Sequence, residues 1–463
     1  MRKRVLPCLV VAAVVPASAH AALRPLTTAI NVANVPKTNE RANAFYGRMR
    51  DAGARAARIT VLWKGLVVRP RPKNFHASNP GAPGYVWNYY DQQVKLAAKN
   101  GLAPLLSIEQ APAWAERGRH PKDGTWNVDP HALAQFATAI ARRYSGTYHG
   151  LPRVRYWLVW NEPNLSRHLA PQVVRGKLVG AAHYRTLVNA FAKAVYAVKR
   201  DNFVVAGLVA PFTFRNDPGP LKFMRALLCM SAGARPHPTC AARTHFDVWS
   251  VHPYTSGGPR HHAFSPNDLS LGDLPKAKRL LDAAARAGHI VSKRPVGLWV
   301  TEFGWDSKPP DAKGVPLTLH SQWVSEALYR AWKAGVSLFA WFPFVDQARP
   351  SPYQGGLYFV DGKAKPALAA FRFPFVAIRR RRSVFVWGRA PAGRPATVVV
   401  ERSIAGGWKR VAAIRTNRVG IFSRVLAVRL PRVGFMRARS GDVTSISFPL
   451  KLPRDLFVTP FGS

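Results

Sequence analysis

Two glutamates stand at the ends of apolar segments that have the composition of buried strands. Glu162 follows the apolar part of RVRYWLVWNEPNL (153–165), and Glu302 follows that of VGLWVTEFGW (296–305); the chain has only seven glutamates among 463 residues. Moving a carboxylate out of water is costly unless it is paired, hydrogen-bonded or protonated. Two carboxyls in such positions can divide a reaction between them. A protonated one donates its proton as a general acid, and an ionised one attacks as a nucleophile.

The segment from about 25 to 372 alternates strand-like apolar runs with helix-like periodic runs, which is typical of a parallel α/β fold. Strand candidates are Thr27–Ala33, Ala57–Trp63, Ala103–Ile108, Val154–Trp160, Val204–Ala210, Val248–Val251, Val296–Thr301 and Ser337–Trp341, with helical patterns over 39–52, 88–99, 132–144, 182–199, 274–287 and 319–334. Eight such units predict a (β/α)₈ TIM barrel. A doubly wound sheet is the alternative, but no glycine-rich phosphate loop follows the first strand.

In a (β/α)₈ barrel the functional residues sit at the carboxyl ends of the strands. Glu162 ends the fourth predicted strand and Glu302 the seventh, and these two strands face each other across the barrel mouth. The fold prediction therefore brings together two carboxylates that lie 140 residues apart in the chain.

The residues around both glutamates carry a family resemblance. Asn161-Glu162-Pro163 after an apolar strand resembles the acid/base motif of clan A retaining glycoside hydrolases, and Thr301-Glu302-Phe303-Gly304 resembles their nucleophile motif. The resemblance covers about 25–372 and is nearest to the cellulase-like families 5 and 39. It implies an acid/base role with a raised pKa for Glu162, a nucleophile role for Glu302, two carboxyls about 5–5.5 Å apart, and no cofactor. Asn161 would bind the sugar 2-hydroxyl.

Other positions fit the same resemblance. Arg58 in the second strand corresponds to an arginine near the nucleophile, where its charge would keep Glu302 ionised. His252 and Tyr254 in SVHPYT resemble a pair beside the nucleophile, and the tyrosine hydroxyl would orient its carboxylate. Trp341, which ends the eighth strand, corresponds to a sugar-stacking platform. Each also has a plain structural interpretation, as a surface arginine, as loop packing or as core.

The remaining strand-end residues leave alternatives open. Trp63, Trp114 and Trp305 follow strand ends, where their faces would suit sugar rings or would simply cover the barrel. The third strand departs from the family 5 pattern, because Ser107–Gln110 (SIEQ) stands where a histidine is expected. Glu109 in this segment either binds a substrate hydroxyl or pairs with an arginine.

The amino terminus has the pattern of a secretory signal. Three basic residues precede a short apolar stretch and a small-residue cleavage site, so residues 1–21 are predicted to be removed and the protein to be secreted without membrane insertion. Cys8 would leave with this segment. Cys229 and Cys240 then form an even pair, which in an exported protein favours a disulfide over two free thiols.

The net charge of +45 bears on partners rather than on fold. It indicates an anionic glycan or cell-wall polymer, nucleic acid, or simply a high arginine content throughout the source proteome. Specific nucleic-acid binding is disfavoured, because no zinc-finger, RNA-recognition or phosphate-loop pattern accompanies the charge. No His-Glu-x-x-His or comparable motif predicts a metal site.

The domain plan places a catalytic barrel at 22–372, a basic linker at 373–382 with four consecutive arginines, and a small antiparallel β-sandwich at 383–463. Three rival functions remain: a non-catalytic carbohydrate-binding barrel, a transglycosylase using the same residues, and a basic cell-wall adhesion protein. The sugar, the linkage, exo or endo action and the oligomeric state are not predicted.

Overall fold

The computed structural model describes residues 24–118, 124–428 and 433–460. The predicted signal peptide, residues 1–21, lies outside the described residues. Within the described ranges, no helix combines the length and the apolar composition needed to cross a bilayer.

Eight parallel strands close into a barrel in the order β1-β14-β11-β9-β7-β4-β3-β2. Their bounds are β1 Thr27–Asn31, β2 Ala56–Leu62, β3 Ala103–Glu109, β4 Tyr156–Val159, β7 Phe203–Val209, β9 Val248–Val251, β11 Gly297–Val300 and β14 Val336–Trp341. The (β/α)₈ barrel and its eight predicted strands are confirmed.

Strand alternation decides which side chains enter the barrel. One buried cluster takes members from all eight strands, among them Leu105, Val205 and Leu338, and therefore fills the barrel interior. Leu106 and Ile108 belong instead to the larger core between strands and helices. Because side chains alternate along a strand, Leu105, Ser107 and Glu109 of β3 all face inward.

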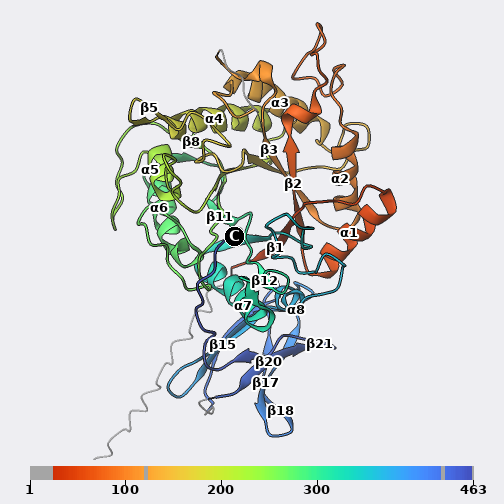
Figure 1. Cartoon of the computed structure of the whole chain (residues 1–463), viewed down its shortest axis with the longest axis vertical. Coiled ribbons are helices and arrows are strands. Elements are labelled where there is room, and N and C mark those ends of the chain that lie inside the picture. The colour runs from red at the N-terminus through yellow and green to blue at the C-terminus, as the bar shows by residue number, and fades with distance from the viewer. Residues whose placement is uncertain (1–23, 119–123, 429–432, 461–463) are drawn as a thin grey trace, which may run out of the picture.

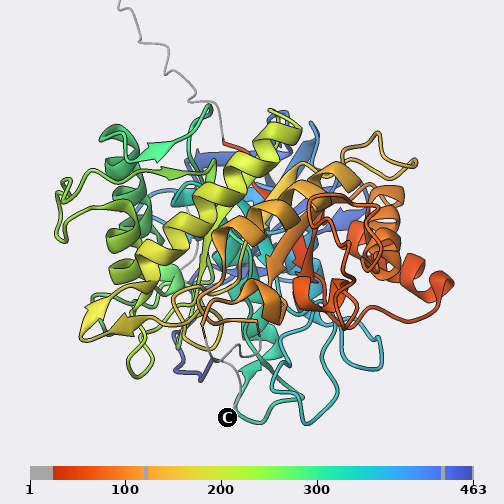
Figure 2. The same ribbon diagram turned by 90° about the horizontal axis from the view of Figure 1, so that it is seen from above.

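Helices surround the strands, as Figures 1 and 2 show. They are α1 Asn39–Asp51, α2 Asn88–Lys99, α3 Pro130–Arg143, α4 Gly180–Val198, α5 Pro220–Leu228, α6 Leu274–Arg286, α7 Leu317–Lys333 and α8 Pro366–Arg372. The six predicted helices are confirmed, and α5 and α8 are additional. Short two-residue strands lie in the loops: β5 Val173–Val174, β6 Lys177–Leu178, β8 Thr244–His245, β10 Ile290–Val291, β12 Ser307–Lys308 and β13 Val315–Pro316.

The C-terminal region consists of antiparallel sheets below α7 and α8 (Figure 1). One sheet has the order β15-β16-β19 and the other β18-β17-β20-β21, with β22 also paired to β20. The strands are β15 Phe375–Arg379, β16 Val384–Arg389, β17 Thr397–Ile404, β18 Gly407–Arg415, β19 Ile421–Leu426, β20 Phe435–Ser440, β21 Val443–Thr444 and β22 Phe448–Pro449.

The predicted basic linker at 373–382 is wrong for its first half. Phe375–Arg379 forms β15, which pairs with β16 and buries Phe375, Val376 and Ala377. The four arginines 379–382 are exposed around the turn between these strands. The linker was predicted from the charge of the four arginines, and the apolar residues just before them, which form most of β15, were overlooked.

The two regions are joined by an aromatic contact and by the returning chain. Trp387 of β16 packs against Tyr329 and Trp332 of α7, each with ring centroids 5.6 Å apart. Beyond β22 the chain runs back to the barrel, where Trp323 Nε1 donates to the Arg454 carbonyl and the Val458 amide donates to the Ser256 carbonyl.

The disulfide between Cys229 and Cys240 is confirmed. It closes a short loop that begins at the end of α5. Replacing both cysteines by serine should lower the free energy of unfolding by about 2–3 kcal/mol, because the open loop gains conformational entropy in the unfolded chain. Denaturant unfolding of the double variant would measure this change. Since the loop lies away from the two glutamate motifs in the fold, kcat/KM should stay at the wild-type value, and a loss of activity without loss of stability would contradict the structural role.

Candidate active site

The two glutamate motifs meet through one guanidinium. Arg58, buried inside β2, donates from Nη1 to Glu302 Oε2 at 2.7 Å and from Nη2 to Asn161 Oδ1 at 2.6 Å. A planar guanidinium presents its donors in a fixed fork, so this single side chain fixes the position of both motifs relative to each other. The structure brings Arg58, Asn161 and Glu302 together, as the strand order predicts.

Glu302 lies just beyond β11 and accepts three side-chain hydrogen bonds. Asn31 Nδ2 at the end of β1 donates to Oε2 at 2.9 Å, beside the Arg58 contact. The Tyr254 hydroxyl donates to Oε1 at 3.1 Å. The side chain is 18 % exposed. The three hydrogen bonds therefore fix its orientation while part of the carboxylate remains accessible from the barrel mouth. Sequence patterns did not single out Asn31, although a polar residue that ends an apolar strand is a signal of the same kind.

Glu162 is buried and surrounded by basic groups. Its Oε1 lies 3.3 Å from His252 Nδ1, and its Oε2 lies 3.3 Å from both His168 Nε2 and Arg167 Nη2. His252 therefore contacts Glu162 rather than the predicted nucleophile. His168 and Arg167 were not predicted, because they lie in a loop whose sequence has no periodic pattern.

The expectation of a raised pKa for Glu162 is wrong. Burial raises the pKa of this carboxyl, but hydrogen bonds with His168 and His252 outweigh burial and hold the pKa below the ordinary value of a glutamate. The resting side chain is therefore a carboxylate at neutral pH, and its acid form grows as the pH falls.

Strained backbone surrounds this carboxyl. Trp160 has φ 69° and Glu162 has φ 42°, in the left-handed region that residues with a Cβ rarely occupy. The Glu162 amide donates to the Leu208 carbonyl of β7 at 3.0 Å, which holds the turn in place. Such strain costs about 1–3 kcal/mol per residue and concentrates at functional sites. Here it directs the side chain of Glu162 toward the imidazoles.

Two hydroxyl groups lie on the Nε2 side of His252, opposite the nitrogen that faces Glu162. His252 Nε2 lies 3.1 Å from Thr301 Oγ1, which lies 2.6 Å from Ser250 Oγ. One consistent proton assignment has Ser250 donating to Thr301, Thr301 to Nε2, and Nδ1–H to Glu162. In this assignment Nε2 accepts from Thr301 and Nδ1 carries the proton that faces Glu162.

His168 offers a test of how the Glu162 pKa is set. Replacing His168 by alanine removes a hydrogen bond that lowers this pKa, so the pKa of Glu162 should rise. A general acid must be protonated, and kcat/KM falls as the pH rises through its pKa. The alkaline limb of the kcat/KM profile should therefore move to higher pH in His168→Ala. The exposed His131→Ala on α3 is the matched control, and an unshifted limb in His168→Ala would refute the assignment.

Most predicted aromatic platforms are buried. Trp341 is 0 % exposed and donates from Nε1 to the Gly355 carbonyl, so its face is closed to a sugar. Trp63 is also fully buried and stacks on Phe136. Trp305 is buried with its Nε1 bonded to the Gly257 carbonyl. The platform role fails for Trp341 because its ring packs in the core against Phe303, His320 and Phe371.

Phe342 and Trp114 keep partly exposed rings. Phe342, one residue beyond Trp341, points to the opposite side as strand alternation requires, and it lies at 5.0 Å from the Tyr353 ring. Trp114 is half-buried, with the Arg71 guanidinium 4.8 Å from its ring centroid. Phe342 thus takes the exposed position that the sequence prediction gave to Trp341.

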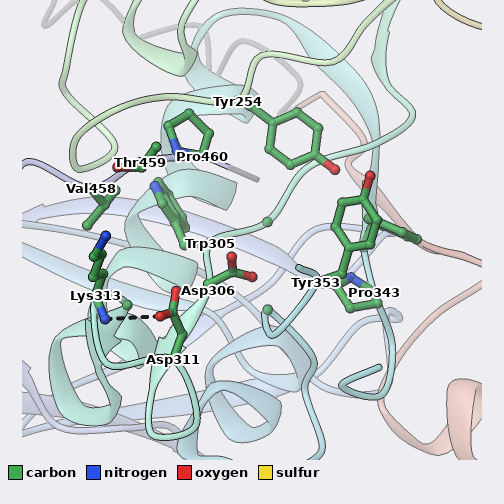
Figure 3. A pocket seen from close by; sticks show the side chains of 14 residues that line it. Tyr254, Trp305, Asp306, Asp311, Lys313, Pro343, Tyr353, Val458, Thr459 and Pro460 are labelled. Carbon is green, nitrogen blue, oxygen red and sulfur yellow. Dashed lines mark hydrogen bonds between the residues drawn. The ribbon is translucent and has the colours of Figure 1, made fainter. Parts of the chain in front are cut away.

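A pocket beside the nucleophile extends the site (Figure 3). Tyr254, Phe342 and Tyr353 line one part, and the returning segment 458–460 lines another. Asp306 also lines it, and burial raises the pKa of this carboxyl to about 6. The Tyr254 hydroxyl, which reaches Glu302, connects this pocket to the nucleophile.

The described ranges contain no cluster of three histidine, cysteine, aspartate or glutamate side chains that could hold a metal ion.

Structural comparison identifies proteins with the same fold. A family 39 glycoside hydrolase from Bacteroides cellulosilyticus WH2 superposes with a TM-score of 0.53 at 16 % identity, covering 88 % of this chain and 81 % of that one. The chain has the fold of this hydrolase. A family 39 β-xylosidase from Caulobacter crescentus matches with a TM-score of 0.52 at 16 % identity, covering 89 % of this chain and 96 % of that one.

A third solved structure, a glucosidase from Croceicoccus marinus, matches with a TM-score of 0.50 at 14 % identity, over 88 % of this chain and 94 % of that one. No protein-family model matches the sequence. No curated protein matches it. The similarity is therefore one of fold, and the chemistry has to be argued from the site.

Proposed function

We propose that this protein is a secreted retaining glycoside hydrolase. The observation that carries the proposal is the Arg58 bridge, which binds the Glu302 carboxylate and the Asn161 amide at 2.7 and 2.6 Å and so sets the two glutamate motifs side by side. The strand-end positions match those of catalytic residues in (β/α)₈ enzymes, and the proteins of similar fold are glycoside hydrolases.

The proposed reaction proceeds by double displacement. Glu302 attacks the anomeric carbon while the bond to the leaving oxygen breaks, and Glu162, reacting in its protonated form, gives that oxygen its proton. Water then attacks the glycosyl-enzyme, Glu162 accepts the proton of that water, and the bond to Glu302 breaks. Arg58, Asn31 and Tyr254 hold the nucleophile in its ionised, oriented form, and Asn161 binds the 2-hydroxyl.

Secretion and substrate class belong to the same proposal. The signal-like pattern at 1–21 and the disulfide support an extracytoplasmic protein. The names of the β-xylosidase and the glucosidase of similar fold suggest xylosides and glucosides as the first substrates to test. The net charge of +45 adds anionic glycans to the panel.

Covalent labelling tests the proposal. Activated 2-deoxy-2-fluoro glycosides of xylose, glucose, mannose and glucuronic acid trap a glycosyl-enzyme, and peptide mass spectrometry locates the adduct. We expect one sugar on Glu302, and no adduct in Glu302→Gln. If no probe in the panel labels the wild-type protein and no glycoside is hydrolysed, the chain is instead a binding barrel.

A further inference from the structure

A third buried carboxyl faces the same site. Glu109 is the last residue of β3, paired in register with Leu62 of β2, and it is only 9 % exposed. It follows Leu105 and Ser107 on the inward face of the strand, and Ser107 Oγ lies 3.4 Å from Arg58 Nη2. The side chain of Glu109 thus enters the barrel mouth on the side of Arg58.

Within the described residues, Glu109 has no hydrogen bond or ion pair through its side chain, and its Oε2 is enclosed without a partner. The arginine that could neutralise it is already engaged, because the Nη atoms of Arg58 bind Glu302 and Asn161. An unsatisfied buried polar group costs about 1–3 kcal/mol. A buried polar group that stays without a partner in a folded protein therefore needs an explanation, such as a ligand that it binds.

Burial favours the neutral form of Glu109. Burial raises the pKa of this carboxyl, Arg58 and His168 lower it, and Glu302 and Glu162 raise it again, with a net rise. A protonated carboxyl offers one donor and one carbonyl acceptor, which matches a sugar hydroxyl. A uronate in the same place would bring a further negative charge beside Glu162 and Glu302 in a buried site.

We infer that Glu109 is a specificity-determining residue that hydrogen-bonds a hydroxyl of a neutral sugar at the reacting subsite. This inference rests on the proposed function and narrows it, because it assigns the unexplained third-strand position to substrate recognition.

The test compares Glu109→Ala and Glu109→Gln on aryl glycosides and their monodeoxy analogues. Glutamine keeps a donor and an acceptor, so it should retain most activity, whereas alanine should lower kcat/KM about ten- to hundredfold, the equivalent of one lost hydrogen bond to substrate. One deoxy analogue, lacking the contacted hydroxyl, should be hydrolysed equally by wild type and Glu109→Ala. An equal loss on the parent glycoside and on every analogue would overturn the inference.

Stability and binding separate recognition from structure. A recognition role predicts that Glu109→Ala unfolds at the same or a higher temperature, because the unpaired carboxyl is removed; a lowered melting temperature together with unchanged selectivity would overturn it. Calorimetry with methyl glycosides of xylose, glucose, mannose and glucuronic acid supplies a readout without catalysis. Weaker binding of a neutral glycoside by Glu109→Ala supports the inference even if Glu302 is never labelled, whereas binding of the glucuronide alone overturns it.

Discussion

Glu302→Gln should lower kcat/KM by about 10⁴- to 10⁶-fold on every glycoside that the wild type cleaves. The amide cannot form the covalent intermediate, and loss of a nucleophile removes the central step of the reaction rather than one interaction among several. Steady-state hydrolysis of an aryl glycoside measures the loss directly. The fold should survive, because glutamine keeps the shape of the side chain and an oxygen that accepts from Arg58 and Asn31.

The control for this variant removes a carboxylate elsewhere. Glu401 lies in β17 and pairs with Arg437 at 2.7 Å, far along the chain from the barrel mouth. Glu401→Gln should retain wild-type kcat/KM. If Glu302→Gln kept activity within about tenfold of wild type, Glu302 could not be the nucleophile. Even the loss of a general acid or base lowers the rate by more than about tenfold, and the loss of a nucleophile should lower it further.

Glu162→Ala should show an effect that depends on the leaving group. With a poor leaving group the first step needs a proton, so kcat/KM should fall by about 10²- to 10⁴-fold. With a dinitrophenolate leaving group the first step needs no proton, and kcat/KM should stay near the wild-type value. The second step still lacks its base, so kcat should fall and the glycosyl-enzyme should accumulate.

Azide supplies the decisive check on that variant. The small anion fits where the carboxylate stood and attacks the intermediate without a base, so it should restore kcat and yield a glycosyl azide. Intact-protein mass spectrometry should show the adduct disappear as azide is added. A uniform loss on all leaving groups, with no response to azide, would mean that Glu162 holds structure rather than moving protons.

The barrel and its two glutamates were predictable because they depend on short-range patterns. Eight apolar runs separated by periodic helices leave few topologies, and strand ends then fix where Glu162 and Glu302 meet. Arg58 was predictable from the family resemblance, which implies an arginine in the second strand near the nucleophile. These features need the order of elements along the chain and no knowledge of the loops.

The rest of the site depends on loops and on small rotations. The sequence predicted an exposed ring at Trp341, but the partly exposed ring is that of Phe342. A shift of one residue along a strand turns a side chain to the other face. His168 reaches Glu162 only because the loop after β4 folds back, and the left-handed residues Trp160 and Glu162 have no local signal of their own. The Glu162 pKa could not be predicted because it is a balance between burial and two imidazoles.

The returning segment around Arg454–Val458 makes one wall of the pocket, though not the eight-stranded barrel, dependent on residues that follow the C-terminal sheets in the chain. Trp323 of α7 and Ser256 in the loop after β9 gain these partners only after the C-terminal sheets have left the ribosome, since the segment follows those sheets in the chain. A nascent chain with all eight strands still carries an incomplete wall beside Tyr254. The pocket next to the nucleophile therefore matures late in biogenesis, and a proteolytic cut after the barrel would leave eight intact strands around an unfinished site.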